Sequence, residues 1–119
     1  YPQRQSSTLP SLDLTSISKL HFEAPDLDRF PCISLAYRAL KAGGTLPAAM
    51  NAANEAAVAA FLDERICLTE IPLVIEGVMN CHEPGPIESI DSVLEVDSWA
   101  RVAAVEEIEK IARKPASVA

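Results

Sequence analysis

The chain has 119 residues, enough for one small domain, and carries a formal net charge of -7 at neutral pH. Hydrophobic residues make up 49% of it and charged residues 23%, a composition that can form a buried core and is unlike that of disordered chains. The acidic balance opposes binding to nucleic acids and anionic membranes. No apolar run is long enough to span a membrane, and no signal peptide is recognisable. We therefore expect a globular domain that binds neither nucleic acid nor membrane.

The three cysteines, Cys32, Cys67 and Cys81, are odd in number and widely spaced. This pattern argues against a disulfide framework and for a reducing compartment, which predicts a cytoplasmic protein. The sequence begins at Tyr1 rather than at a methionine. We interpret this start as a position inside a longer protein or as the result of processing.

Residues 1–25 do not have the pattern of a domain. Prolines interrupt the segment, and its apolar residues are scattered, with two pairs that alternate with other residues as in short extended pieces. A free linker would not need so many large apolar side chains, so we predict an ordered arm that lies across another protein surface. The apolar anchors of this arm are Leu12, Leu14, Ile17, Leu20 and Phe22.

The first main helix is predicted to begin near Asp26 and Asp28, with Pro31 in its first turn, where the missing N–H has no cost. It ends at Gly43-Gly44, because glycine can adopt the left-handed conformation of a helix C-cap. Apolar residues recur along it at helical spacing and predict its buried face. These residues are Ile33, Ala36, Tyr37 and Leu40.

The next helix is rich in alanine, and we expect it to lie at the centre of the fold because small side chains let neighbouring helices approach closely. Thr45 or Asn51 can act as its N-cap. Asn51, Asn54 and Glu55 are polar residues within a pattern that is otherwise buried, where they need hydrogen-bond partners. We interpret them as capping or inter-helix contacts, with the lining of a neighbouring site as the alternative.

A third helix is predicted to start near Thr69 and Pro72. Ser89 begins a short helical turn, and a separate last helix, capped by Asp97, runs to about Arg113. The resulting fold class is mainly α, a four-helix-type bundle with an extended N-terminal linker arm. The predicted buried residues are Ile71, Val74, Ile75 and Val78 in the third helix, and Trp99, Val102, Val105, Ile108 and Ile111 in the last.

Candidate groups for catalysis are few. The adjacent Cys81 and His82 point in different directions if they are helical, so we interpret them as a helix end and a loop residue rather than a catalytic pair. No ligands recur at the spacing of a zinc site, and the four glycines form no phosphate-binding loop. We therefore assign no catalytic, cofactor-binding or metal-binding residue to this chain.

Two blocks of the sequence carry a specific resemblance. Leu20–Pro31 (LHFEAPDLDRFP) and Leu46–Leu62 (LPAAMNAANEAAVAAFL) resemble, in order and spacing, the C-terminal region of 1-deoxy-D-xylulose 5-phosphate reductoisomerases. The resemblance implies a homodimer of three-part subunits, with an NADPH-binding domain, a central catalytic domain and a C-terminal helical bundle. On this basis residues 1–25 are the end of the catalytic domain and a linker, and residues 26–119 are the bundle domain.

The resemblance also implies the reaction. Enzymes of this family rearrange 1-deoxy-D-xylulose 5-phosphate and reduce it with NADPH to 2-C-methyl-D-erythritol 4-phosphate, in the non-mevalonate route to isoprenoids. Mg or Mn acts as a Lewis acid. The family's metal- and phosphate-binding residues precede the stretch matched here, so we expect this chain alone to be inactive and to bind neither NADPH nor metal.

Four residues stay as candidates for a place near the active site. Pro2 is one, because the family's chain passes close to the pocket there, and Asn51, Asn54 and Glu55 are the others. The alternative function is a stand-alone helical interaction module, dimeric through its alanine-rich face.

Overall fold

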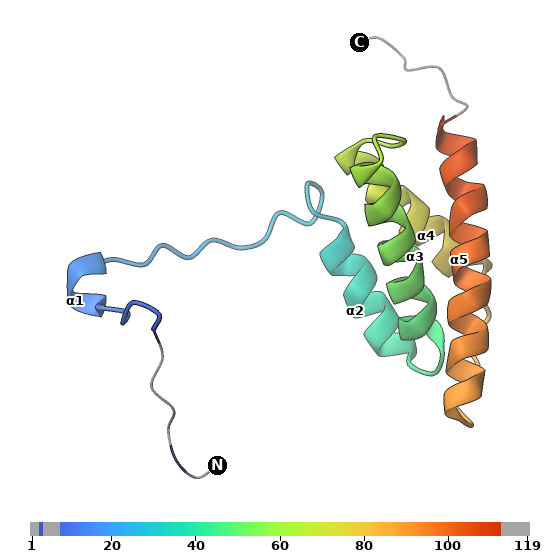
Figure 1. Ribbon diagram of the computed structural model, residues 1–119, viewed down its shortest axis with the longest axis horizontal. Helices are drawn as coiled ribbons and strands as arrows, with labels where there is room; N and C mark the ends of the chain where they lie inside the picture. The colour runs from blue at the N-terminus through green and yellow to red at the C-terminus, as the bar shows by residue number, and fades with distance from the viewer. Residues whose placement is uncertain (1–2, 4–7, 113–119) are drawn as a thin grey trace.

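The computed structural model describes residue 3 and residues 8–112, and it shows a long arm leading into a helical bundle (Figure 1). Within these residues no strand is present, which confirms the mainly α fold class. The arm joins the bundle at the start of the helix α2 (Cys32–Ala42). The elements are α1 (Leu14–Ile17), α2 (Cys32–Ala42), α3 (Leu46–Leu62), the single 3-10 turn η1 (Leu68–Glu70), α4 (Ile71–Cys81) and α5 (Ile90–Ala112).

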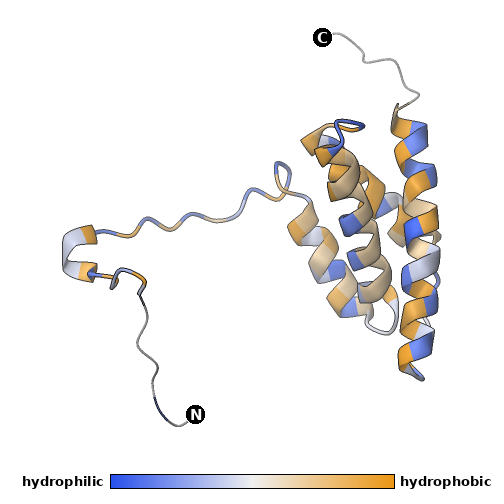
Figure 2. Ribbon diagram, in the orientation of Figure 1, coloured by the Kyte–Doolittle hydropathy of each residue, from blue (hydrophilic) through white to orange (hydrophobic). Residues whose placement is uncertain are grey.

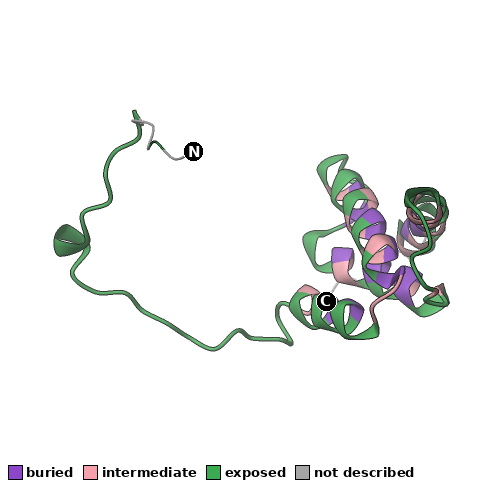
Figure 3. Ribbon diagram, turned by 90° about the horizontal axis from the view of Figure 1, so that it is seen from below, coloured by how far each residue is buried: buried purple, intermediate pink, exposed green. Residues whose placement is uncertain are grey.

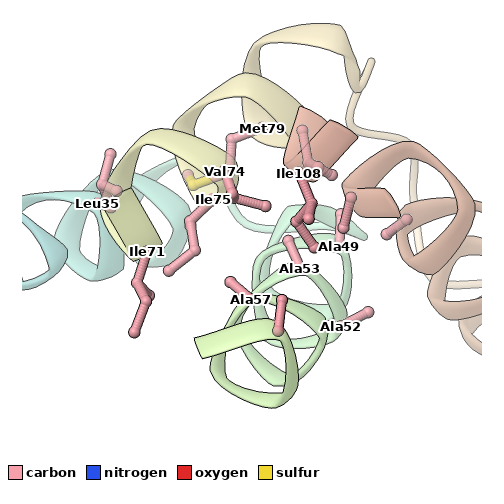
Figure 4. Close-up of a cluster of buried hydrophobic side chains, with 14 of the residues drawn as sticks. Leu35, Ala49, Ala52, Ala53, Ala57, Ile71, Val74, Ile75, Met79 and Ile108 are labelled. Atoms are coloured by element: carbon pink, nitrogen blue, oxygen red, sulfur yellow. The ribbon is translucent and has the colours of Figure 1, made fainter. Parts of the chain in front are cut away.

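The alanine-rich helix α3 lies at the centre of the bundle, as predicted. It packs against α5, α4 and α2, and alanine methyl groups fill much of the contact (Figure 4). The alanine-rich face is therefore not available for dimerisation, because helices of the same chain already cover its methyl groups. The fully or nearly fully buried alanines of α3 are Ala49, Ala52, Ala53, Ala57 and Ala60.

The helix α4 presents its predicted stripe to the core. Val74, Ile75 and Val78 are fully buried, and Ile108 of α5 meets them from the other side (Figure 4). The predicted buried face of this helix is confirmed in full, since Ile71 is buried as well. Val74, Ile75, Val78 and Ile108 are the largest fully buried side chains of the described residues.

The last helix is one continuous element, so the prediction of a short turn followed by a separate helix is wrong. Ser89 does start it, and the Ser92 N–H donates to Ser89 Oγ at 3.1 Å. Asp97 is not a cap but lies inside α5, where its carboxylate accepts from Arg101 one turn later. Aspartate is a residue type that often caps helices, but Asp97 marks no helix end here. Its side chain pairs with Arg101 on the same helix instead.

The buried face of α5 was also predicted in part wrongly. Ile108 is buried, but Val102 is 62% exposed and Val105 is exposed too. Ala100 and Ala104 face the core instead. Small residues occupy the inner face of α5 because this helix packs closely against α3, and a larger side chain would hold the two helices apart.

The helix α2 shows the same reversal. Its buried residues are Leu35 and Ala39, whereas the predicted Tyr37 and Leu40 are 69% and 72% exposed. The helix also starts later than predicted, at Cys32, because Asp26 closes a separate turn by accepting from the Arg29 N–H at 2.9 Å. Its predicted end at Gly43 is confirmed.

The arm lies clear of the bundle, and every described residue of it is exposed (Figure 3). One turn of helix, α1, interrupts it and is capped by Asp13, whose carboxylate accepts from the Thr15 N–H at 2.9 Å. Leu14 is therefore helical rather than part of an extended piece. That the arm rests on another protein surface stays a prediction.

Replacement of Ala53 by leucine tests the close approach of α3 to its neighbours. Ala53 is fully buried, so the added atoms should lower the free energy of unfolding by roughly 1–3 kcal/mol. Ala59→Leu on the exposed side of α3 is the matched control and should stay within about 0.5 kcal/mol of the parent. Urea unfolding followed by circular dichroism gives both values, and equal effects would contradict the packing.

Replacement of Gly44 by alanine tests the contact between the α2–α3 turn and the loop before α5. Gly44 has a φ of 54°, and a Cβ there would collide with the carbonyl oxygen of Gly85. Gly43 has a φ of 67° but faces open space. Both alanine variants should lose about 1–2 kcal/mol from the positive φ, and Gly44→Ala should lose more. Unfolding midpoints that rank the other way would contradict this geometry.

Candidate functional site

The predicted near-site residues of α3 lie on its polar side. Asn51 and Glu55 are exposed and Asn54 is partly buried. Asn51 sits inside the helix, so its interpretation as an N-cap is wrong. Pro2 lies outside the described residues.

Glu55 is the centre of a charged cluster that links α3 to α5. Arg101 donates from Nη2 to Glu55 Oε2 at 2.6 Å, and Asn51 donates from Nδ2 to Glu55 Oε1 at 3.1 Å. Arg101 also donates from Nε to Asp97 Oδ2 at 2.7 Å. These hydrogen bonds connect the exposed side of α3 to α5.

The electrostatics of this cluster suit a clamp rather than an acid or base. Hydrogen bonds from Arg101 and then Asn51 hold the pKa of the Glu55 carboxyl below its ordinary value. Hydrogen bonds to Asp97 and Glu55 raise the pKa of Arg101 in turn. A carboxylate that stays ionised and already accepts from two donors is a weak proton acceptor at neutral pH. The interpretation of Asn51 and Glu55 as inter-helix contacts fits this geometry.

Arg101 was missed by reasoning from the sequence. A signal was present, because Asp97 and Arg101 are four residues apart and so lie on the same side of a helix. The long-range partner, Glu55, could not be read from spacing, because it lies 46 residues away in the sequence.

A second polar junction ties the α2–α3 turn to the loop before α5. The Thr45 hydroxyl lies 2.8 Å from Nε2 of His82, and it accepts from the Gly85 N–H at 3.1 Å. The Thr45 N–H in turn donates to the Gly85 carbonyl at 3.0 Å. Thr45 occupies the N-cap position of α3, which confirms the predicted position, but its hydroxyl makes no cap hydrogen bond and bonds to the loop instead.

His82 is held between this hydroxyl and an aromatic ring. It follows the last residue of α4, as predicted, and its ring centroid lies 5.1 Å from that of Trp99 on α5. Burial lowers the pKa of His82, because the protonated ring would lose solvation. The neighbouring surface also carries Glu83 and Glu95. Because burial disfavours the protonated form, the folded state favours the neutral His82 ring.

An apolar cleft of about 710 Å³ opens where the arm meets the bundle. Phe30, Pro31 and Cys32 line one side, and Leu68 and Ile71 line the other. Burial raises the pKa of the Cys32 thiol, so this thiol stays protonated and is a poor nucleophile at neutral pH. The lining is mostly apolar, and Asp28, Arg29 and Thr69 are its polar members.

Within residues 8–112, no group of three or more His, Cys, Asp or Glu side chains is placed to hold a metal ion. None of the helices in this part of the chain is long and apolar enough to cross a membrane.

The stability of the bundle should depend on pH through His82. Because its folded pKa lies below the ordinary value of 6.5, the unfolded chain binds the proton more tightly. The His82 contribution is therefore complete above pH 6.5 and is lost as the pH falls below it, towards the lower folded pKa. Thermal unfolding measured between about pH 8 and pH 5 should show this decline.

Two variants separate His82 from other acid-sensitive groups. His82→Gln should flatten the decline in this pH range, whereas His21→Gln in the exposed arm should leave it unchanged. If the slope in His82→Gln equals that of the parent chain, the decline belongs to other groups.

Comparison with known proteins gives a consistent result. The sequence profile of the DXP reductoisomerase C-terminal domain matches residues 1–103. A 1-deoxy-D-xylulose 5-phosphate reductoisomerase of Acetivibrio thermocellus is 52% identical over 110 residues, which is 92% of this chain and 29% of that protein. One from Trichlorobacter lovleyi is 53% identical over 104 residues, 87% of this chain and 27% of the relative. The chain thus spans less than a third of the length of these relatives.

Solved structures agree with the sequence relatives. The reductoisomerase of Zymomonas mobilis in complex with NADPH superimposes with a TM-score of 0.82 at 41% identity, over 92% of this chain and 29% of that one. A DOX-P reductoisomerase with NADPH, fosmidomycin and magnesium gives a TM-score of 0.84 at 33% identity, over 97% of this chain and 30% of that one. The chain belongs to the family of DXP reductoisomerase C-terminal domains.

Proposed function

We propose that this chain is the C-terminal part of a longer, cytoplasmic 1-deoxy-D-xylulose 5-phosphate reductoisomerase and that it supports the active site without supplying it. The observation that carries the proposal is the family match over residues 1–103, combined with relatives that are about half identical and more than three times as long. The activity in question converts 1-deoxy-D-xylulose 5-phosphate to 2-C-methyl-D-erythritol 4-phosphate, with NADPH as the reductant and Mg or Mn as the Lewis acid.

The residues described here do not fit either NADPH or the metal. Among them, no cluster of carboxylates, imidazoles or thiols could hold a divalent cation. Gly43 and Gly44 serve a helix end and a close backbone contact rather than a phosphate-binding loop. We therefore derive no catalytic step through this chain, and we place both ligands in the part of the enzyme that precedes it.

The role that remains is mechanical. In this proposal residues 1–25 are the end of the catalytic domain and a linker, and residues 26–119 are the bundle. The exposed apolar side chains of the arm, such as Leu20 and Phe22, support this division, because exposed apolar surface of this kind marks a contact with other protein. The three free thiols suit a reducing compartment. By family resemblance the complete enzyme is a homodimer.

The proposal predicts where turnover is found. The protein encoded by the complete reading frame should oxidise NADPH when supplied with 1-deoxy-D-xylulose 5-phosphate and Mg²⁺, and removal of the metal with EDTA should abolish the reaction. Residues 1–119 alone should give no turnover and should retain no NADPH in equilibrium dialysis. Absorbance of NADPH reports the first result, and mass spectrometry of the product confirms it.

Two results would contradict this function. Turnover by residues 1–119 alone would place the catalytic groups in this chain. A reading frame that starts at the codon of Tyr1 would remove the proposed catalytic part altogether, and the chain would then be a bundle with another role.

A further inference from the structure

Thr45 is the one buried polar residue of the described part of the chain, and its hydroxyl is shared between two partners. Nε2 of His82 lies 2.8 Å from Thr45 Oγ1, and the Gly85 N–H donates to the same oxygen at 3.1 Å. Both partners belong to residues 82–89, the loop that joins α4 to α5. We call Thr45, His82 and Gly85 the loop junction.

The proton of the Thr45 hydroxyl decides the direction of the hydrogen bond to His82. This proton needs an acceptor, because a buried O–H without a partner is costly. The Gly85 N–H cannot accept it, since it is itself a donor. Thr45 therefore donates to Nε2 of His82, and this ring nitrogen carries no proton. The loop junction holds a neutral imidazole whose proton is on Nδ1.

Protonation of His82 is incompatible with this arrangement. An imidazolium has a proton on both ring nitrogens and accepts from neither. The His82 Nε2–H and the Gly85 N–H would then both point at Thr45 Oγ1, and the hydroxyl proton would have no acceptor among its partners in the described chain. Water cannot readily replace the acceptor, because only 4% of Thr45 is exposed. The loop junction thus fits one charge state of His82 and not the other.

The charged ring has a more favourable position on the neighbouring surface. His82 lines an open hollow of about 470 Å³ together with Glu83 of the loop and Glu95 of α5. Hydrophilic residues recur along the whole of α5 (Figure 2). An imidazolium that turned outward would regain water and approach these carboxylates, which attract a cation. Cys81 at the end of α4 is the remaining titratable residue of the hollow.

The other groups around the junction do not favour a charged ring in the inward position. On α2, Arg38 pairs with Glu76 at 3.5 Å and Lys41 lies in the last turn, and both cations repel an imidazolium. The α2–α3 turn and the first turn of α3 contain no titratable residue. The ring of Trp99, whose centroid lies 5.1 Å from that of His82, accommodates either charge state. Burial lowers the pKa of His82, which agrees with this preference.

We propose that the loop junction is a pH-sensitive latch. With His82 neutral the latch is closed, and Thr45 ties the loop 82–89 to the start of α3. With His82 protonated the ring leaves Thr45 for the side of Glu83 and Glu95. Water then reaches the Thr45 hydroxyl and competes with the Gly85 N–H for its oxygen, so the loop is released. This latch is a property of the bundle and is independent of the reaction proposed for the complete protein.

The release is local. The Thr45 N–H also donates to the Gly85 carbonyl at 3.0 Å, and this backbone hydrogen bond involves no titratable group. It limits how far the loop moves and lets the latch close again when the pH rises. The core that joins α3, α4 and α5 consists of apolar side chains, whose burial does not depend on protonation.

NMR of the histidine ring nitrogens in the 119-residue chain tests the closed form. At about pH 7.5, His82 should be protonated on Nδ1 and unprotonated on Nε2. His21 in the exposed arm is the internal reference for a ring without this constraint. A proton on Nε2 of His82 at this pH would make Thr45 the acceptor and would overturn the latch.

Amide hydrogen exchange tests the release. The protection factor of the Gly85 N–H, which removes the intrinsic pH dependence of exchange, should fall several-fold between about pH 7.5 and pH 5. At the lower pH it should be about tenfold or more below that of Ala104, which is fully buried in α5. Constant protection of Gly85 would show that protonation releases nothing. Equal protection of Gly85 and Ala104 would show that the loop opens only when the whole bundle unfolds.

Three variants assign the effect to the hydroxyl and to the ring. Thr45→Val keeps the shape of the side chain but removes the donor, so the pKa of His82 should rise towards its ordinary value and Gly85 should lose protection at both pH values. Thr45→Ser keeps the hydroxyl and should behave like the parent chain. His82→Gln keeps an acceptor that does not titrate, so protection of Gly85 should no longer depend on pH.

The variants also have a contradicting outcome. If Thr45→Val changes neither the titration of His82 nor the protection of Gly85, the hydroxyl is not part of a latch. The measurements on the ring nitrogens and on the Gly85 amide use the parent chain, so they decide the question even if a variant does not fold.

Discussion

Close approach of α3 to its neighbours is the constraint on which the rest of the bundle depends. Apart from Leu46, its buried residues are alanines, so the backbones of α4 and α5 come near enough for Ile75 and Ile108 to fill the space between them. Each methyl group buries little area, and the apolar stabilisation comes from the larger side chains that the alanines admit. The same closeness decides which residues of α5 face inward, and it selects Ala100 and Ala104.

Polar contacts then fix the register of helices that apolar packing brings together. Arg101 joins Glu55 on α3 to Asp97 on α5 across the rim of the bundle, and Thr45 joins the α2–α3 turn to the loop that leads into α5. Exposed ion pairs of this kind contribute little net stability. Their geometry agrees with the rotation of α5 that packing sets, in which Ala100 and Ala104 face the core.

Periodicity predicted the existence and type of the four main helices, and it predicted the inner face of α4 in full. The prediction of buried faces failed where a larger apolar side chain is exposed and a smaller one is buried. Val102 and Val105 form an apolar row on α5, and the smaller Ala104 is the residue that fits against α3. On α2 both sides are apolar, so the pattern could not tell the core side, marked by Leu35, from the outer side, marked by Tyr37.

The sequence predicted which residues belong to the candidate site but not the contacts that they make. The polar residues Asn51 and Glu55 stood out because an alanine-rich helix surrounds them, but their roles depend on Arg101, which lies far away in the sequence. The block that most specifically identifies the family is thus a block that organises helix contacts. Its alanines are buried against neighbouring helices and its Glu55 pairs with Arg101, so packing and inter-helix pairing account for the residue types of this block.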